Sequence, residues 1–386
     1  MKSINTPDQF DHQLPWPVWA VVLGGLCMTV GILWDISWHE TIGRDTFWTP
    51  AHLLIHFGGI TGGASGAWLI WKATFGGDQT WHDRSIRIAG LYGPLGAWIC
   101  LWGCLAMLTS APLDDWWHNA YGLDVKILSP PHMVLAAGMY SLVVGGVLIT
   151  LSWNNQASAT LAPRTQALLI AAGGIVVTLS SVVYTEFSRP NSQHTAFFYK
   201  LTSIAYVAPL VYLARAIQHR WAATMVAAIY MGIYCLLIWI LPLFAAEPML
   251  APIYHPVDAM VPPPFPLLLV VPAIAIDLVL RLVSPDSPAW KQWLLSVGLG
   301  VAFFAVFFPV EWHFAAFLLT PAADNHFFAG NRYWAYFERV GDWRDDFWGL
   351  SRDPMTLGAA LAAILGACLS ARVGLWLGHW MLRLRR

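Results

Sequence analysis

The sequence predicts an all-α, polytopic transmembrane helix bundle of about ten spans that contains a duplicated helical hairpin. Of the 386 residues, 57% are apolar and only 11% are charged, whereas soluble domains carry roughly 25% charged residues. The mean hydropathy is +0.55. The apolar residues form long runs, and a helix that crosses a bilayer needs ~20 of them. Open sheet is excluded from such runs, because unpaired backbone groups in lipid are too costly.

The spans are placed by this length criterion. The first run is long enough to cross the membrane by itself and has no cleavable signal before it, so we expect a signal anchor. Asp277 falls in the middle of the eighth run and needs a partner inside the bundle. The predicted spans are 16–38, 50–75, 86–110, 130–153, 166–185, 196–215, 221–244, 265–283, 291–311 and 356–380.

The distribution of Lys and Arg predicts the orientation. If the N-terminus is inside, the cations of the short loops fall mostly on the inner side, and the outer loop 247–264 has none. The long outer loop 311–354 contains four Arg, but long loops count less in this rule. We therefore expect an inner-membrane protein with both termini in the cytoplasm. The inner cations are Lys72, Arg84, Arg87, Arg164, Arg215, Arg220, Arg281, Lys291, Arg383, Arg385 and Arg386.

The histidines gather on the predicted outer side. Nine of the 13 fall at outer helix ends or in outer loops, and histidine is the commonest metal ligand. This skew favours one chemistry at the outer face. The net charge of −1 shows no excess of Lys and Arg of the kind that nucleic-acid-binding proteins have, so we expect no nucleic-acid partner. The nine are His39, His52, His56, His118, His132, His194, His255, His313 and His326.

A first motif lies at residues 34–52, which read WDISWHETIGRDTFWTPAH. Asp35 and His39 are four residues apart and therefore share one helix face. Pro50 suits the first turn of the next helix, so a short hairpin returns His52 to the same place. One carboxylate and two imidazoles make a site for copper, zinc or iron with open positions. Taken alone, the motif would favour a buried hydrogen-bonded Asp–His pair.

The motif recurs at residues 113–132, which read LDDWWHNAYGLDVKILSPPH. Asp114, His118 and His132 repeat the first set, at an offset of 79 residues up to the Asp and 80 at the second His. The sequence therefore predicts an internal duplication of two helical hairpins. We divide the chain into 1–153, the duplicated region with its outer Asp/His motifs, and 154–386, the remaining bundle with its long outer loops.

The first motif resembles the metal-binding segment of the C subunit of particulate methane and ammonia monooxygenases. That segment has the form D-x-x-W-H, then R-D-T, then T-P-x-H, and residues 35–39, 44–46 and 49–52 match it. The resemblance covers about twenty residues and implies that Asp35, His39 and His52 are copper ligands. The second motif lacks the Arg-Asp-Thr run. The family subunit has fewer spans and a single motif, and this chain contains no cupredoxin-like domain. The resemblance therefore implies ligands, not catalysis.

Three further residues are candidates for supporting roles. His56, one turn after His52, is equally compatible with a ligand and with a residue that hydrogen-bonds a ligand. Asp45 and Asp124 occupy matching positions after the two helices and either attract cations or are solvated loop residues. Glu311 and His313 form a looser cluster with Asp324 and His326, for which interfacial hydrogen bonding is favoured.

These observations predict a copper-binding membrane protein with one or two ions, with zinc and iron as alternatives. The favoured function is a copper-dependent membrane monooxygenase, or a subunit of one, acting on a small apolar substrate. The alternatives are copper storage or transfer, and a non-catalytic subunit of a respiratory complex. Expected partners are the lipid bilayer and other membrane or periplasmic subunits.

Overall fold

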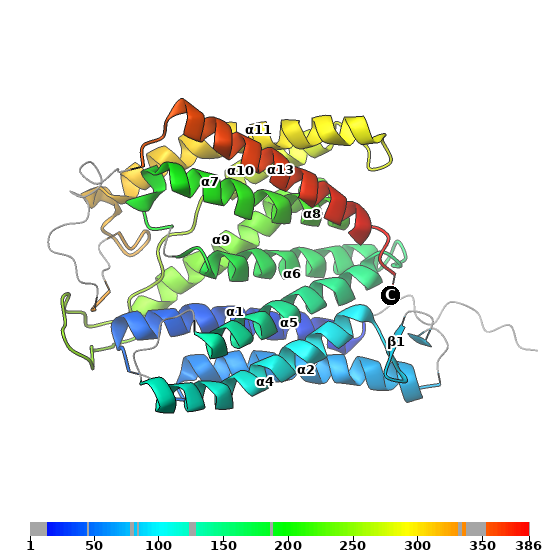
Figure 1. The fold of residues 1–386 in the computed structure, drawn as a ribbon, viewed down its shortest axis with the longest axis horizontal. Helices are drawn as coiled ribbons and strands as arrows, with labels where there is room; N and C mark the ends of the chain where they lie inside the picture. The colour runs from blue at the N-terminus through cyan, green and yellow to red at the C-terminus, as the bar shows by residue number, and fades with distance from the viewer. Residues whose placement is uncertain are drawn as a thin grey trace, which may run out of the picture. The chain divides into compact units, whose positions relative to one another are not determined.

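The computed structural model describes residues 14–44, 46–77, 81–82, 85–122, 129–185, 188–330, 334–336 and 353–385. Within these ranges the chain is predominantly helical, and nine helical segments are long and apolar enough to cross a membrane (Figure 1). Their 21 to 30 residues match the ~20 that a span requires. The chain is thus a multi-pass helical membrane protein.

The helices that form these segments follow one another along the chain. Two segments are composite, because α7 is followed directly by α8, and α9 by the 3-10 helix η4. The elements are α1 (Trp16–Thr41), α2 (Pro50–Phe75), α4 (Leu95–Tyr121), α5 (Pro130–Asn154), α6 (Ala162–Val182), α7 (Ala196–Ala205), α8 (Val207–Ile217), α9 (Ala222–Ile240), η4 (Leu241–Leu243), α11 (Ala289–Leu318) and α13 (Leu357–Met381), with the 3-10 helices η3 (Ser192–His194) and η5 (Pro321–Ala323).

The predicted eighth span, 265–283, is not a full-length helix. Its helical part, α10 (Val270–Leu280), has 11 residues and is about 16 Å long, roughly half of the hydrocarbon core. The preceding residues contain Pro262, Pro263, Pro264 and Pro266, which cannot supply helical N–H donors, and this stretch is non-helical. Proline therefore reduces the expected ten full spans to nine in the part of the chain that is described.

The third predicted span also differs at both ends. Residues 86–93 form an antiparallel hairpin of β1 (Ile86–Ile88) and β2 (Leu91–Gly93), turned by Ala89 and Gly90, both with positive φ. The helix α4 begins after this hairpin and continues to Tyr121. Asp114 and His118 therefore lie on a helix rather than in a loop.

Asp277 finds its partner at the start of another helix. Its carboxylate accepts hydrogen bonds from the backbone N–H groups of Ala223 (3.1 Å) and Thr224 (2.9 Å), and from the Thr224 hydroxyl (2.7 Å). These are the first residues of α9, whose N–H groups have no intrahelical acceptor. A negative charge at a helix N-terminus is stabilising, so this buried acid has a structural role.

The chain divides into two compact units, and their boundaries in the sequence differ from the predicted boundary at residue 153. One unit comprises residues 1–29, 54–176 and 383–386, and the other comprises 30–53 and 177–382. The last turns of α1 belong to the second unit. The first motif therefore groups with the C-terminal half, and the second motif with the first unit.

Glycines allow close helix crossings in the first unit. A Cβ atom added at Gly58 of α2 would lie 2.4 Å from the Gly24 carbonyl oxygen of α1. A Cβ atom added at Gly138 of α5 would lie 2.7 Å from the Gly103 carbonyl oxygen of α4. Small residues at such contacts are typical of membrane helix pairs, where van der Waals packing drives association.

Candidate metal centres

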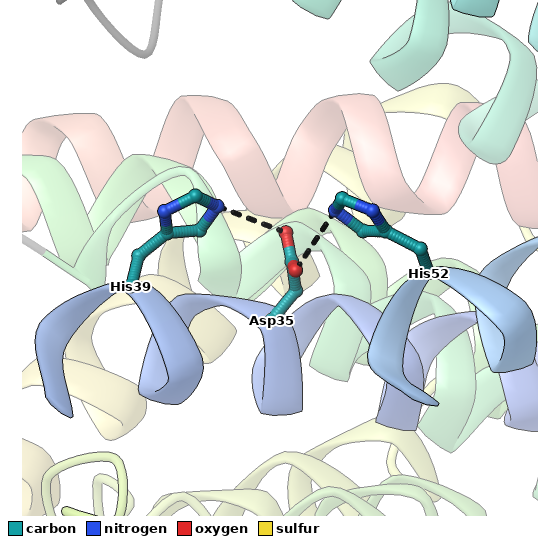
Figure 2. A group of neighbouring side chains, drawn as sticks. All are labelled: Asp35, His39 and His52. Atoms are coloured by element: carbon teal, nitrogen blue, oxygen red, sulfur yellow. Dashed lines mark ion pairs between the residues drawn. The ribbon is translucent and has the colours of Figure 1, made fainter. Parts of the chain in front are cut away.

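The structure brings Asp35, His39 and His52, here called the first cluster, to one point. His52 Nε2 lies 3.1 Å from Asp35 Oδ1, and His39 Nε2 lies 3.8 Å from Asp35 Oδ2. Figure 2 shows the two imidazoles pointing toward the carboxylate from opposite sides. One donor atom from each residue lies within 4.8 Å of the other two. The Asp35 side chain is 13% exposed and the His39 side chain 47%, so the cluster is open on the His39 side.

Local sequence explains this convergence. Asp35 and His39 lie one turn apart near the end of α1, on the same face. Gly43 then takes φ +82°, a conformation that favours glycine, and the chain turns back to start α2 at Pro50. His52 is the third residue of α2, so a hairpin of this length is enough to complete the cluster.

A backbone carbonyl orients the His52 ring. His52 Nδ1 lies 2.9 Å from the Thr46 carbonyl oxygen. Because a carbonyl only accepts hydrogen bonds, Nδ1 carries the proton of the neutral ring and donates it. The lone pair is then on Nε2, the atom that faces Asp35. Metal-bound histidines are usually held in this way by a partner on the other ring nitrogen.

Segments remote in sequence hold the last turn of α1. The Ser37 hydroxyl donates to the Val261 carbonyl, and the Val261 N–H donates to the Thr41 hydroxyl (2.9 Å). Farther along, the Ala335 N–H donates to the Glu40 carbonyl (3.0 Å), and the Tyr336 hydroxyl donates to the Ile42 carbonyl (2.5 Å). The last two contacts satisfy the carbonyls of Glu40 and Ile42 at the end of α1, and all four fix the turn that carries His39.

The second cluster, Asp114, His118 and His132, has the same arrangement. His118 Nε2 lies 3.4 Å from Asp114 Oδ2, and His132 Nε2 lies 3.5 Å from Asp114 Oδ1. Gly122, with φ +96°, ends α4, and its carbonyl oxygen is 3.3 Å from His118 Nδ1. Asp114 is more exposed than Asp35, at 33% of its side chain. The second cluster is therefore more open to solvent at its carboxylate.

Both donor sets could hold a metal ion. Two ligands bound at about 2.0 Å in tetrahedral geometry lie about 3.3 Å apart, close to the four Nε2···O distances of 3.1 to 3.8 Å. Asp35 Oδ1 and Asp114 Oδ1 are buried, and neither accepts a hydrogen bond of good geometry from any described residue. A buried oxygen of this kind is costly unless something satisfies it, and a cation at the centre of each cluster would do so.

The other predicted site residues are His56, Asp45 and Asp124. Asp45 and Asp124 fall outside the described residues. His56 lies on α2 one turn beyond His52 but does not belong to the converging set, and no third such group occurs in the described ranges. His194 lies apart, with Nε2 donating to the Trp312 carbonyl (2.9 Å), and burial lowers the pKa of this imidazole to about 4.

The Tyr336 contact provides a test of how far the loops position the first cluster. Tyr336→Phe removes the hydroxyl that donates to the Ile42 carbonyl and accepts from the Met249 and Leu250 N–H groups. We expect metal affinity at the first cluster to fall about 10-fold, as for other residues that orient ligands, with the second cluster unchanged. Competition titration of each cluster, with the other disabled by a His→Ala change, measures this. An equal loss at both clusters would contradict a local positioning role.

Comparisons with known proteins leave the family undetermined. No family model matches this chain, no curated protein matches it, and no solved structure matches it. The resemblance of the first motif to the monooxygenase C subunit thus stays a prediction.

Proposed function

We propose that the chain is a copper-binding integral membrane protein in which the first cluster is the copper site of a membrane monooxygenase or of one of its subunits. Metal binding is supported by the convergence of Asp35, His39 and His52 around a buried carboxylate oxygen that accepts no hydrogen bond from the described residues. The choice of copper follows from imidazole donors, from the high affinity of copper among divalent metals, and from the motif resemblance.

The residues of the first cluster would have distinct tasks. Asp35 supplies the negative charge that binds a cation in a low-dielectric region. His52, oriented by the Thr46 carbonyl, and His39 supply neutral donors. Bound copper would contribute one-electron redox chemistry with dioxygen. Because three protein ligands leave coordination positions open, the cluster is compatible with catalysis as well as with storage.

The duplication belongs to this proposal, because it would give the chain two related sites. The offset of the motifs recurs in the packing of the helices. Gly24 and Gly103, which lie at the two close crossings, are 79 residues apart, and their partners Gly58 and Gly138 are 80 apart. The positive φ of Gly43 and Gly122 recurs at an offset of 79 as well. These matches support two hairpins of common origin.

Two other functions compete. Storage or transfer of copper is favoured by the second cluster, since a more exposed carboxylate would exchange its metal more readily. A non-catalytic role in a larger complex would leave each Asp paired with its histidines without metal. Iron is a competing metal, because two histidines and one carboxylate are also the ligands of non-haem iron oxygenases.

An isotope experiment tests the catalytic proposal. Membranes containing the copper-loaded protein, a reductant and ¹⁸O₂ are incubated with a short-chain alkane, and the alcohol is analysed by mass spectrometry. We expect ¹⁸O in the product from the unmodified chain and none from His39→Ala. Unlabelled or absent product, with copper bound at the first cluster, would rule out oxygenation of this substrate class and favour storage.

The orientation is proposed from the charge pattern, which places both termini in the cytoplasm of the inner membrane. It requires α10 and the non-helical residues before it to complete a tenth crossing together. A reporter fused after Arg386 and one inserted near Asp83 are both expected to give cytoplasmic signals. A periplasmic signal from either would overturn this orientation and the outer location of the histidines.

A further inference from the structure

One end of the second compact unit is rich in cations. Here α8 and α10 end and α11 begins, on the right of Figure 1. Four cations lie at these helix ends, Arg215, Arg220, Arg281 and Lys291, and Arg372 from within α13 reaches them through its contact with Trp293 of α11. We call these five cations the basic rim. The 281–288 connection between α10 and α11 contains one acid, Asp286. The rim therefore has a strong excess of positive charge.

Carboxylates neutralise little of this charge among the described residues, where Asp277 attracts Arg281 without forming an ion pair with it. Within the described ranges, no member of the rim forms an ion pair with an Asp or Glu. Arg215, only 9% exposed, donates to two neutral oxygens, the Val283 carbonyl (3.2 Å) and Gln292 Oε1 (3.4 Å). The nearby Asp277 is already engaged by the N-terminus of α9. A net cationic surface at a membrane boundary attracts anionic lipids.

Arg372 is the rim residue with a buried donor atom that lacks an acceptor among the described residues. Its guanidinium carbon lies 4.9 Å from the centre of the Trp293 ring, and its Nε is buried without a hydrogen-bond acceptor among the described residues. Lys291 Nζ lies 5.4 Å from the centre of the Trp290 ring. Trp290 is three residues before Trp293 on α11. Guanidinium and ammonium groups of this kind are common phosphate ligands.

The same region presents large apolar side chains. Trp290, Trp293, Leu294 and Trp376 are each at least half exposed. Trp376 is one helical turn beyond Arg372 on α13. Tryptophan is enriched at the membrane–water interface, where its ring contacts both headgroups and acyl chains. Cations and apolar surface are therefore adjacent, as an amphiphilic anion requires.

We propose that the basic rim binds the headgroup of an anionic phospholipid, with Lys291 and Arg372 at the phosphate and the exposed Trp and Leu side chains against the acyl chains. A soluble phosphate would use the cations but leave the apolar surface without a ligand. This inference does not depend on either metal cluster. Each cation near an anionic membrane surface contributes about fivefold to binding.

Native mass spectrometry of the full chain in detergent tests this proposal. Dioleoyl-phosphatidylglycerol is titrated against dioleoyl-phosphatidylcholine and against glycerol phosphate. We expect saturable binding of the anionic lipid, weaker binding of the zwitterionic lipid, and no binding of glycerol phosphate at the same concentrations. The double change Lys291→Gln and Arg372→Gln should lower affinity roughly 30-fold, about fivefold per charge.

The matched control removes two exposed cations of the first unit, Arg87→Gln and Arg164→Gln, and should bind like the unmodified chain. If the rim variant does not fold, the affinity of the unmodified chain for the anionic lipid is measured at increasing salt concentration. The proposal requires this affinity to fall as salt rises. Equal affinity for both lipids, tight binding of glycerol phosphate alone, equal losses in both double variants, or salt-independent binding would each overturn the proposal.

Discussion

Replacing His39 or His52 with alanine is expected to remove one metal ion per chain while the helices stay assembled. Residues that merely orient ligands cost 10–100-fold in affinity when changed, so loss of a ligand itself should exceed about 100-fold. His118→Ala or His132→Ala should remove the second ion and leave the first. Metal content after gel filtration, with circular dichroism to verify helicity, measures both effects.

His255→Ala is the matched control, because His255 is a histidine that belongs to neither cluster. It should retain the full metal content. If His255→Ala loses as much metal as His39→Ala, or if both His39→Ala and His52→Ala lose none, the first cluster is not a metal centre.

Gly58→Ala is expected to destabilise the chain by about 1–3 kcal/mol, the usual cost of inserting a methyl group into a packed site. The new Cβ atom would lie 2.4 Å from the Gly24 carbonyl oxygen and 2.8 Å from Met28 N, both backbone atoms that cannot move aside cheaply. The α1–α2 crossing would have to open. Gly138→Ala should have a similar effect at the α4–α5 crossing.

Gly232→Ala is the control, since nothing lies within 4 Å of a Cβ atom at this position of α9. There alanine removes a helix-interior glycine and should stabilise by up to about 1 kcal/mol. Unfolding midpoints in one detergent compare the three variants. Equal midpoints for Gly58→Ala and Gly232→Ala would contradict the close crossing.

The helices were largely predictable because a span must be a long apolar run, whatever packs against it. The predicted helix bounds were wrong where particular residues shorten or extend a helix relative to its apolar run. Prolines shorten α10 to 11 residues. Residues 86–88 enter a short hairpin, although they precede an apolar run. The end of α4 was missed because Pro112, Asp114 and Asp115 are typical of a loop, yet α4 continues through them to Tyr121.

The clusters were predictable for a related reason. Four-residue spacing and a short hairpin are local features, and these alone bring His52 to Asp35. The hydrogen bonds that orient His52 and hold the end of α1 were not predictable. The Thr46 carbonyl is a backbone group, and the contacts of Val261 and Tyr336 with the end of α1 join residues more than 200 positions apart. Neither leaves a pattern in a single sequence.

Metal analysis of the purified, copper-replete protein tests the central claim most directly. Inductively coupled plasma mass spectrometry is expected to find about one or two copper ions per chain, one for each three-ligand cluster, with zinc and iron at trace levels. Electron paramagnetic resonance of the oxidised sample should show nitrogen coordination that diminishes in His39→Ala. Absence of bound metal, with the Asp35 carboxylate hydrogen-bonded to His52 instead, would contradict the account.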